Sequence, residues 1–197
     1  MAPEDLARLL DPPRAGLDSS DYDLNPEITL PPGRKLRAAA VLIGICDGAA
    51  GPSVLLTKRA SGLKHHPGQI AFPGGKIETS DASPEAAALR EADEEVGLDP
   101  AQVQVIGRLP AHETVTGYAV TPILGHIRDA FAPRAQAGEV AEVFQVPLAH
   151  LSDRRNFRIE QRIWLGQWRR YYAVPYGPYY IWGATARMLR ALAERMA

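Results

Sequence analysis

The sequence lacks several features that would assign a protein to a class at once. Cys46 is the only cysteine among 197 residues, so no disulfide can form within the chain and nothing favours a secreted, disulfide-stabilised domain. No apolar run approaches the ~20 residues that a membrane-spanning helix needs, and the N-terminus lacks the pattern of a signal peptide. The formal net charge is −1, whereas a general nucleic-acid binder carries a basic surplus. We therefore expect a cytoplasmic protein that binds neither membrane nor nucleic acid.

Length and composition favour one domain with a short extension. A chain of this length with 46% hydrophobic residues can bury one sizeable core but is short for two. Residues 1–36 are predicted to be an N-terminal extension that packs on or flanks the core, and residues 37–197 the domain itself. Within the extension, residues 3–10 can form a short helix. The prolines and aspartates that follow predict an extended surface segment.

Hydrophobic patterning in the domain alternates between strands and helices. Strands are predicted over residues 38–46, 54–57, 69–72, 103–107, 118–127, 140–146, 157–165, 168–174 and 179–182, and helices over 84–96 and 183–196. The first strand is apolar throughout, so we expect it at the centre of the sheet with Cys46 as a buried thiol and residues 54–57 as its hairpin partner. Pro122 indicates an edge or a bulge, and Gly166-Gln167 a hairpin turn. The order predicts a mixed α/β/α fold.

The helix over residues 84–96 has clear end signals and an unusual face. Ser83 is a good N-cap, Pro84 suits the first helical position, and Gly97 suits the C-terminal end. Glu91 and Glu95 lie one turn apart with Glu94 beside them, a spacing that costs a helix roughly 0.2–0.5 kcal/mol per like-charged pair. Convergent carboxylates are ligands for a hard cation such as Mg²⁺ or Mn²⁺. The alternative is a solvated acidic face.

The surrounding residues favour the metal interpretation. The string Gly75-x5-Asp81-x8-Arg90-Glu91-Ala92-x-Glu94-Glu95-x-Gly97-Leu98 resembles the box of the Nudix hydrolases, which cleave nucleoside diphosphates linked to another group. The general box has Glu at the position of Asp81 and one residue fewer before Arg90. The resemblance implies a mixed sheet between helices, with Glu91, Glu95 and Glu94 as metal ligands and the Gly74 carbonyl as a further one.

The segment before the box narrows the resemblance to one branch. Leu55-Leu56-Thr57-Lys58-Arg59-Ala60-x3-Lys64-x3-Gly68-x3-Phe72-Pro73-Gly74-Gly75 is similar to the extra signature of the coenzyme A pyrophosphatases, as are residues 139–148 and 180–186. That branch also tolerates the Asp81 form of the box, but it usually has arginine where this chain has Lys64. The resemblance implies hydrolysis of coenzyme A, or of an acyl or oxidised derivative, to 3′,5′-ADP and 4′-phosphopantetheine or its derivative. The alternatives are another substrate, such as ADP-ribose or NADH, and a non-catalytic nucleotide sensor.

Other side chains are candidates for supporting roles. Arg59 and Lys64 are predicted to bind the phosphates of the substrate or the adenosine 3′-phosphate of coenzyme A, with ordinary surface cations as the alternative. Gly74 and Gly75 allow the backbone to approach metal or phosphate closely, unless they form an ordinary turn. The resemblance suggests that Arg90 orients a box glutamate.

The remaining candidates stay open between a role in the site and a structural one. The general base is a box glutamate or a later one, Glu142 or Glu139. His65 and His66 are expected to face solvent. A set of aromatic residues is expected to pack in the core and the hairpin, and the alternatives are adenine stacking, lining of a pantetheine channel and a dimer surface. These residues are Tyr171, Tyr172, Tyr176, Tyr179, Tyr180 and Trp182. The sequence leaves monomer and homodimer open.

Overall fold

A computed structural model of the chain describes residues 1–10, 17–31, 33–164 and 166–196. Its α-helices are α1 (Pro3–Ala7), α2 (Pro84–Val96), α3 (Leu148–Ser152) and α4 (Ala184–Arg195), and short 3₁₀ turns are η1 (Arg8–Leu10), η2 (Pro100–Gln102) and η3 (Arg154–Asn156). Its strands are β1 (Leu17–Ser20), β2 (Arg37–Cys46), β3 (Ser53–Arg59), β4 (Ile70–Ala71), β5 (Gly74–Lys76), β6 (Val103–Arg108), β7 (Ala111–Glu113), β8 (Tyr118–Ile127), β9 (Val140–Pro147), β10 (Arg158–Trp164) and β11 (Gln167–Ala173).

Nine of the described strands form one mixed sheet. Its main path runs β1-β7-β8-β2-β3-β4, while β5 pairs with β2, β6 with β8 and β9 with β3. β2 and β8 are parallel over ten residue pairs, from Arg37↔Tyr118 to Cys46↔Ile127. β3 is the predicted hairpin partner of β2, through Ile45↔Val54, and it also pairs with β9 along its whole length. β2 is thus central, as its continuous apolar sequence predicts.

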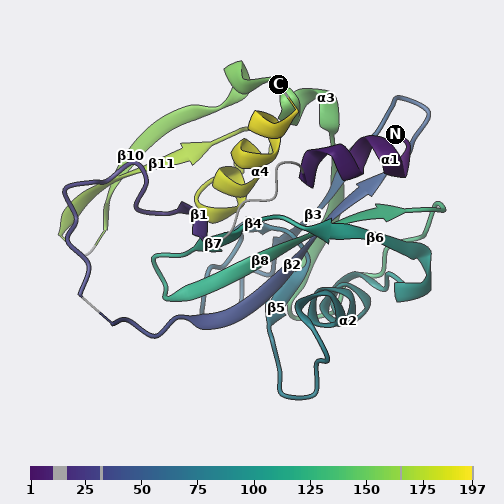
Figure 1. The fold of residues 1–197 in the computed structure, drawn as a ribbon, viewed down its shortest axis with the longest axis horizontal. Helices are drawn as coiled ribbons and strands as arrows, with labels where there is room; N and C mark the ends of the chain where they lie inside the picture. Colours follow the sequence, from purple (N-terminus) through teal and green to yellow (C-terminus); the bar gives the residue numbers. More distant parts are fainter. Residues whose placement is uncertain (11–16, 32, 165, 197) are drawn as a thin grey trace.

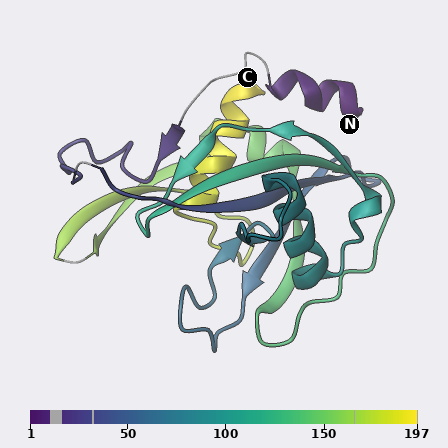
Figure 2. The same ribbon diagram turned by 60° about the horizontal axis from the view of Figure 1, so that its bottom comes forward.

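The two faces of the sheet bury two separate hydrophobic clusters. Successive residues of β2 alternate between them, with Ile43 and Ile45 on one face and Leu42 and Cys46 on the other. The helix α2 covers the second face, whereas α4 lies on the first (Figures 1 and 2). Cys46 is buried, and burial raises the pKa of its thiol to about 11. The predicted α/β/α arrangement is confirmed.

The β10–β11 hairpin stands apart from the main sheet. It is a separate antiparallel ribbon beside α4 (Figure 1), with the register Arg158↔Ala173 to Trp164↔Gln167. The predicted hairpin is therefore confirmed, but the turn predicted at Gly166-Gln167 is wrong, because Gln167 already pairs with Trp164. Residue 165 lies outside the described residues. The strand predicted over residues 179–182 is wrong. Among the described residues, only the isolated bridges Tyr176↔Tyr179 and Ala173↔Trp182 form there.

Pro122 does not lie on a sheet edge. Its strand, β8, pairs with β2 on one side and with β6 and β7 on the other. Pro122 lies at the junction of those two outer strands, where its carbonyl accepts a hydrogen bond from the Leu109 amide at 2.9 Å. A proline in a central strand is tolerated here because no outer strand needs its missing N–H. The irregularity in the register is on β6, between Val105 and Gly107.

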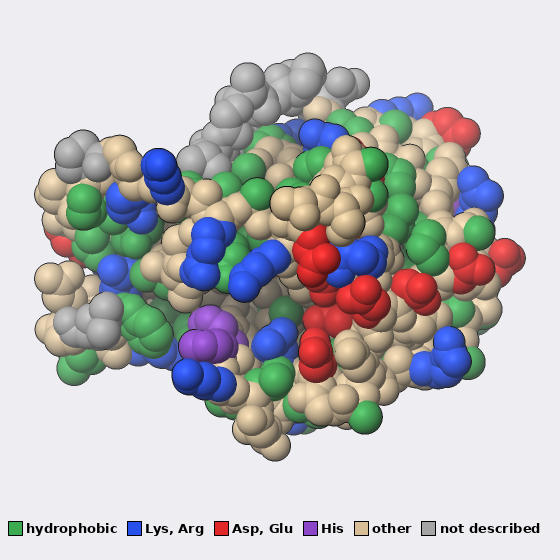
Figure 3. All heavy atoms as spheres, turned by 90° about the horizontal axis from the view of Figure 1, so that it is seen from below, with side chains coloured by type: hydrophobic (Ala, Val, Ile, Leu, Met, Phe, Trp, Pro, Cys, Tyr) green, Lys and Arg blue, Asp and Glu red, His purple; other side chains and the backbone are tan. Residues whose placement is uncertain are grey.

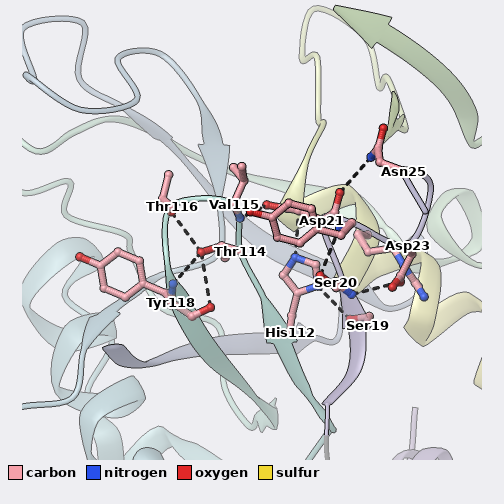
Figure 4. Close-up of polar contacts among 12 residues, drawn as sticks. Ser19, Ser20, Asp21, Asp23, Asn25, His112, Thr114, Val115, Thr116 and Tyr118 are labelled. Atoms are coloured by element: carbon pink, nitrogen blue, oxygen red, sulfur yellow. Dashed lines mark hydrogen bonds and ion pairs between the residues drawn. The ribbon is translucent and has the colours of Figure 1, made fainter. Parts of the chain in front are cut away.

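The N-terminal segment adds β1 to the edge of the sheet, parallel to β7. The ring of His112 joins the two, because Nδ1 is hydrogen-bonded to Ser19 Oγ at 2.9 Å and Nε2 to Asp21 Oδ1 at 3.1 Å (Figure 4). Asp21 also accepts a hydrogen bond from the Val115 amide at 2.8 Å. The prediction of an extended surface segment is wrong for this part, since Ser19 and Asn25 are buried; residues 11–16 lie outside the described residues.

Candidate active site

Helix α2 begins and ends where the sequence predicts. Ser83 Oγ accepts a hydrogen bond from the Ala86 amide at 3.2 Å, and Gly97 adopts a left-handed conformation with φ of 69°. Ala88, Ala92 and Val96 are fully buried against the sheet. This packing fixes the rotation of α2, so its glutamates are presented to the neighbouring strand β5.

The glycine pair of β5 brings backbone into contact with those glutamates. Gly74 has a φ of 155°, and a Cβ atom there would lie 2.4 Å from the Ala40 carbonyl oxygen. A Cβ on Gly75 would lie 2.3 Å from Glu91 Oε1. Any side chain at position 75 would therefore fill the space that the Glu91 carboxylate occupies. Close backbone approach, rather than an ordinary turn, explains both glycines.

Glu91 and Glu95 are carboxylates held in an apolar setting. Glu95 is only 5% exposed, and its Oε2 accepts a hydrogen bond from the Gly74 amide at 3.1 Å. Burial is the main cause that raises the pKa of Glu95 to about 7, and the charge of Glu91 adds to it. Burial likewise raises the pKa of Glu91. A buried and a half-buried carboxylate on one helix face offer the oxygen atoms that a hard divalent cation prefers.

Arg90 is hydrogen-bonded to three acidic side chains of the box. Its guanidinium donates two hydrogen bonds of 3.0 Å to Asp81, and others to Glu91 at 3.1 Å and to Glu94 at 3.2 Å. These contacts are what the predicted orienting role requires. They also lower the pKa of Asp81. Aspartate at position 81 thus reaches the helix despite the longer gap before Arg90.

The three box glutamates do not converge equally. The side chain of Glu94 is 53% exposed and turns to Arg90 instead of joining Glu91 and Glu95. No group of three or more acidic, histidine or cysteine side chains in the described ranges is placed to hold a metal. The geometry therefore favours Glu91 and Glu95 as the side-chain ligands, with Glu94 as the outlying member of the predicted set.

A later loop reaches the same end of α2. The amides of Gln136 and Arg134 donate to the carbonyls of Glu95 and Val96, each at 2.9 Å. Glu139, which follows, carries a charge that raises the pKa of both Glu91 and Glu95. Glu142 is placed differently, because its carboxylate accepts a hydrogen bond from the Tyr179 hydroxyl. Of the two later glutamates, Glu139 therefore has the closer electrostatic link to the box.

The predicted substrate cations differ in their surroundings. Arg59, at the end of β3, has a buried Nε with no hydrogen-bond acceptor among the described residues, and its charge lowers the pKa of Glu95. Lys64 lies exposed on the following loop with His65 and His66. Exposure of the histidines is as predicted, although His66 has an unusual φ of 54°. Arg59 thus borders the box, whereas Lys64 lies in the solvent-exposed loop.

The aromatic residues divide between packing and exposure. Tyr179 stacks on Phe144 with ring centroids 3.6 Å apart, and Tyr172 and Tyr176 pack against the core. Tyr180 is 41% exposed and its hydroxyl lies 3.2 Å from that of Tyr171. Tyr171 packs edge-on against Trp182, with ring centroids 5.2 Å apart. The predicted packing therefore holds for the set, with Tyr180 as its exposed member.

Comparison with known proteins assigns the chain to a family. Residues 35–166 match the family described as the NUDIX domain, and the chain belongs to this family. It is similar to the protein called "Uncharacterized Nudix hydrolase NudL" from Enterobacter sp. (strain 638), with 44% identity over 165 residues that cover 80% of this chain and 81% of the relative. The protein of the same name from Escherichia coli (strain K12) is 46% identical over 160 residues, with the same coverage.

Solved structures agree in fold. The Nudix hydrolase RenU from M. smegmatis superimposes with a TM-score of 0.51 at 26% identity, covering 60% of this chain and 75% of RenU. The NUDIX domain of Shewanella oneidensis NrtR, complexed with ADP ribose, gives a TM-score of 0.53 over 90% of this chain and 97% of that domain, and at 17% identity it shows the fold alone.

Within the described ranges, no helix has the length and apolarity that crossing a bilayer requires. The protein is a Nudix hydrolase that acts on a nucleoside diphosphate derivative.

Proposed function

We propose that the enzyme hydrolyses the diphosphate bond of coenzyme A or of an acyl or oxidised derivative. The observation that carries this proposal is the position of Arg59. It belongs to the segment that resembles the coenzyme A pyrophosphatases, and its charge acts directly on Glu95 of the box. The signature that suggests the substrate is therefore part of the same site as the residues that suggest the chemistry.

Glu91 and Glu95 would hold Mg²⁺ or Mn²⁺, and Arg90 would keep Glu91 in position. A bound divalent cation polarises phosphoryl oxygens and lowers the pKa of a coordinated water. The orphaned Nε of Arg59 would donate to a phosphate oxygen, a charge-assisted hydrogen bond. Glu139 is the carboxylate that we favour for taking a proton from the attacking water, with Glu142 and Glu94 as the other candidates.

The experiment is a substrate comparison with purified protein and Mg²⁺ or Mn²⁺. Coenzyme A should give 3′,5′-ADP and 4′-phosphopantetheine, measured by chromatography, at a higher kcat/KM than ADP-ribose or NADH gives its products. Glu95→Gln should lower kcat by at least about 100-fold while the fold remains, because the amide keeps the shape but not the charge. Intact coenzyme A beside a cleaved dinucleotide would contradict the proposal.

A second candidate is the hydrolysis of another nucleoside diphosphate derivative. The related fold of the NrtR domain, which was solved with ADP ribose, favours including that compound in the comparison. A purely nucleotide-sensing role is the weakest candidate, since Glu91, Glu94 and Glu95 are all present. The same assay separates the three.

A further inference from the structure

The β10–β11 hairpin carries positive charge that the box does not use. Residues 158–173 contain four arginines and one acidic residue, Glu160, in a chain whose formal net charge is −1. Glu160 is already engaged, because its carboxylate accepts a hydrogen bond from the Tyr180 hydroxyl. The hairpin therefore has a local cationic surplus.

Two of these arginines are directly opposed. Arg162 and Arg169 pair in register, so their side chains leave the same face of the hairpin with Cβ atoms about 4.5–5.5 Å apart. Like charges directly opposite each other destabilise a strand pair. Within the described part of the chain, neither guanidinium has an ion pair or a hydrogen bond, and Nε and Nη1 of Arg169 are buried without an acceptor. Buried unsatisfied donors are rare in native proteins and call for an explanation.

Aromatic rings surround both guanidinium groups. Arg162 lies over the rings of Trp164 and Trp182, at 5.1 and 4.6 Å from their centroids. Arg169 lies 5.1 Å from the ring centroid of Tyr22, which comes from the N-terminal extension. Rings of this kind hold a cation in place by its attraction to their faces without neutralising it. The two arginines are thus positioned but still lack an anion.

The opposed arginines connect to the box through the loop after β3. Desolvation of its ring is the main cause that lowers the pKa of His66, although this residue is exposed on the loop, and the charges of Arg59 and Arg162 lower it further. Arg59 also acts on Glu95, so its charge reaches both the box and the loop on which the charge of Arg162 acts. On this face of the molecule, basic and histidine side chains border a hollow beside the acidic group (Figure 3). A ligand bound at the box can therefore extend toward the hairpin.

We propose that Arg162 and Arg169 form a second anion subsite, which binds a phosphate monoester on the ribose of the substrate. Two forked guanidinium groups on one face match the oxygens of such a group. The inference rests on the proposed function. Coenzyme A carries a 3′-phosphate on its ribose, whereas ADP-ribose and NADH carry no third phosphate. The subsite would therefore select among nucleoside diphosphate derivatives.

The test measures binding without turnover, by calorimetric titration of the full chain in the absence of divalent cations. The ligands are 5′-AMP, 3′,5′-ADP and 2′,5′-ADP, which differ only in the ribose phosphate. The wild type should bind 3′,5′-ADP more tightly than 5′-AMP by about 10- to 100-fold, the range that hydrogen bonds to a charged group provide. Arg162→Gln and Arg169→Gln should each remove most of this preference.

Arg170→Gln is the matched control. It removes the same charge from the adjacent position of β11, whose side chain leaves the opposite face and pairs with Glu27 at 3.3 Å. It should keep the preference of the wild type. Arg169→Lys keeps the positive charge but not the forked guanidinium, so it should retain part of the preference for 3′,5′-ADP. It replaces Arg169→Gln in the test if that variant does not fold. Unfolding midpoints of all variants show that a loss of binding is not a loss of structure.

The outcomes separate this inference from the proposed function. A preference for 3′,5′-ADP that depends on both arginines supports the subsite. An equal dependence for 2′,5′-ADP also supports it but argues against coenzyme A as the substrate. No preference, or a preference that survives Arg162→Gln and Arg169→Gln, overturns the subsite, even if the enzyme hydrolyses coenzyme A.

Discussion

At the residue scale, Gly75 shows how tightly the box is built. The carboxylate of Glu91 occupies the space where a β-carbon would stand, at 2.3 Å from its Oε1. The neighbouring Gly74 is constrained separately, by its φ of 155° and the Ala40 carbonyl. The two glycines thus meet different demands: Gly74 allows the strand to lie against β2, and Gly75 leaves room for a functional side chain.

Gly75→Ala should therefore damage activity more than structure. The new methyl group must displace the Glu91 carboxylate, and a shift of about 1 Å in a catalytic group can cost about 100-fold in rate. We expect kcat/KM to fall by at least that factor, while the circular dichroism spectrum remains that of the wild type. Steady-state kinetics with the best substrate measure the effect.

Gly62→Ala is the control for this change. Gly62 lies on the nearby loop and has open space around its would-be β-carbon. Its activity should match the wild type. If Gly75→Ala were equally active, Glu91 would not need its present position and its assignment as a metal ligand would be wrong.

At the scale of elements, the sequence predicted those features that depend on neighbouring residues, such as the ends of a helix. The bounds of α2 follow from Ser83, Pro84 and Gly97, whose effects act within one turn of the helix. The continuous apolar sequence of β2 likewise predicts its central position in the sheet. By contrast, β1, β5 and β7 have four, three and three residues and exist only through pairing with distant strands. Their sequences alone do not specify those pairings.

The site likewise has features that the sequence predicts and features that depend on long-range contacts. The string from Gly75 to Leu98 identified the box, but the sequence could not show that Glu94 turns to Arg90. The choice of Glu139 over Glu142 depends on a loop tied to the end of α2 by long-range hydrogen bonds. The opposition of Arg162 and Arg169 could not be predicted either, because a two-residue turn at Gly166-Gln167 would place Arg162 opposite Tyr171.

His112 provides a test of how the N-terminal extension is attached. The side chain is fully buried and bridges Ser19 and Asp21, which belong to β1 and the turn after it. His112→Ala should lower the free energy of unfolding by about 2–4 kcal/mol, because it leaves a cavity and removes the hydrogen-bond partner of the buried Ser19 hydroxyl. Denaturant unfolding measures the change, and limited proteolysis should show earlier cleavage near residues 17–25.

Arg8→Ala provides the comparison, since its side chain is 80% exposed although it belongs to the same extension. It should unfold within about 0.5 kcal/mol of the wild type. An unchanged stability of His112→Ala would mean that the extension is held by its apolar contacts, such as those of Leu6 and Leu9, and not by this polar bridge.

At the scale of the whole molecule, the box places an electrostatic cost on the fold. Glu95 has a pKa of about 7 in the folded protein against an ordinary value of 4.5. Between these two pH values the folded state binds more protons than the unfolded state, so the contribution of Glu95 to stability falls as pH rises. The full difference is about 3 kcal/mol at 1.36 kcal/mol per pKa unit. Other carboxylates, such as Asp81, change stability in the opposite direction, so the effect must be isolated by comparison.

Glu95→Gln isolates it, because the amide keeps the shape and cannot ionise. In metal-free buffer, its stability relative to the wild type should rise by about 3 kcal/mol between pH 4.5 and pH 8, whereas Glu94→Gln, at an exposed position, should show little change.

Adding Mg²⁺ at pH 8 should stabilise the wild type, by about 2.7 kcal/mol at 100 times the Kd, and stabilise Glu95→Gln much less. Urea unfolding at each pH measures both. A difference that stayed flat with pH would show that Glu95 is not desolvated, and equal stabilisation by Mg²⁺ would place the metal elsewhere. Both expected results together would mean that the ion offsets a cost which the metal-free fold bears at neutral pH.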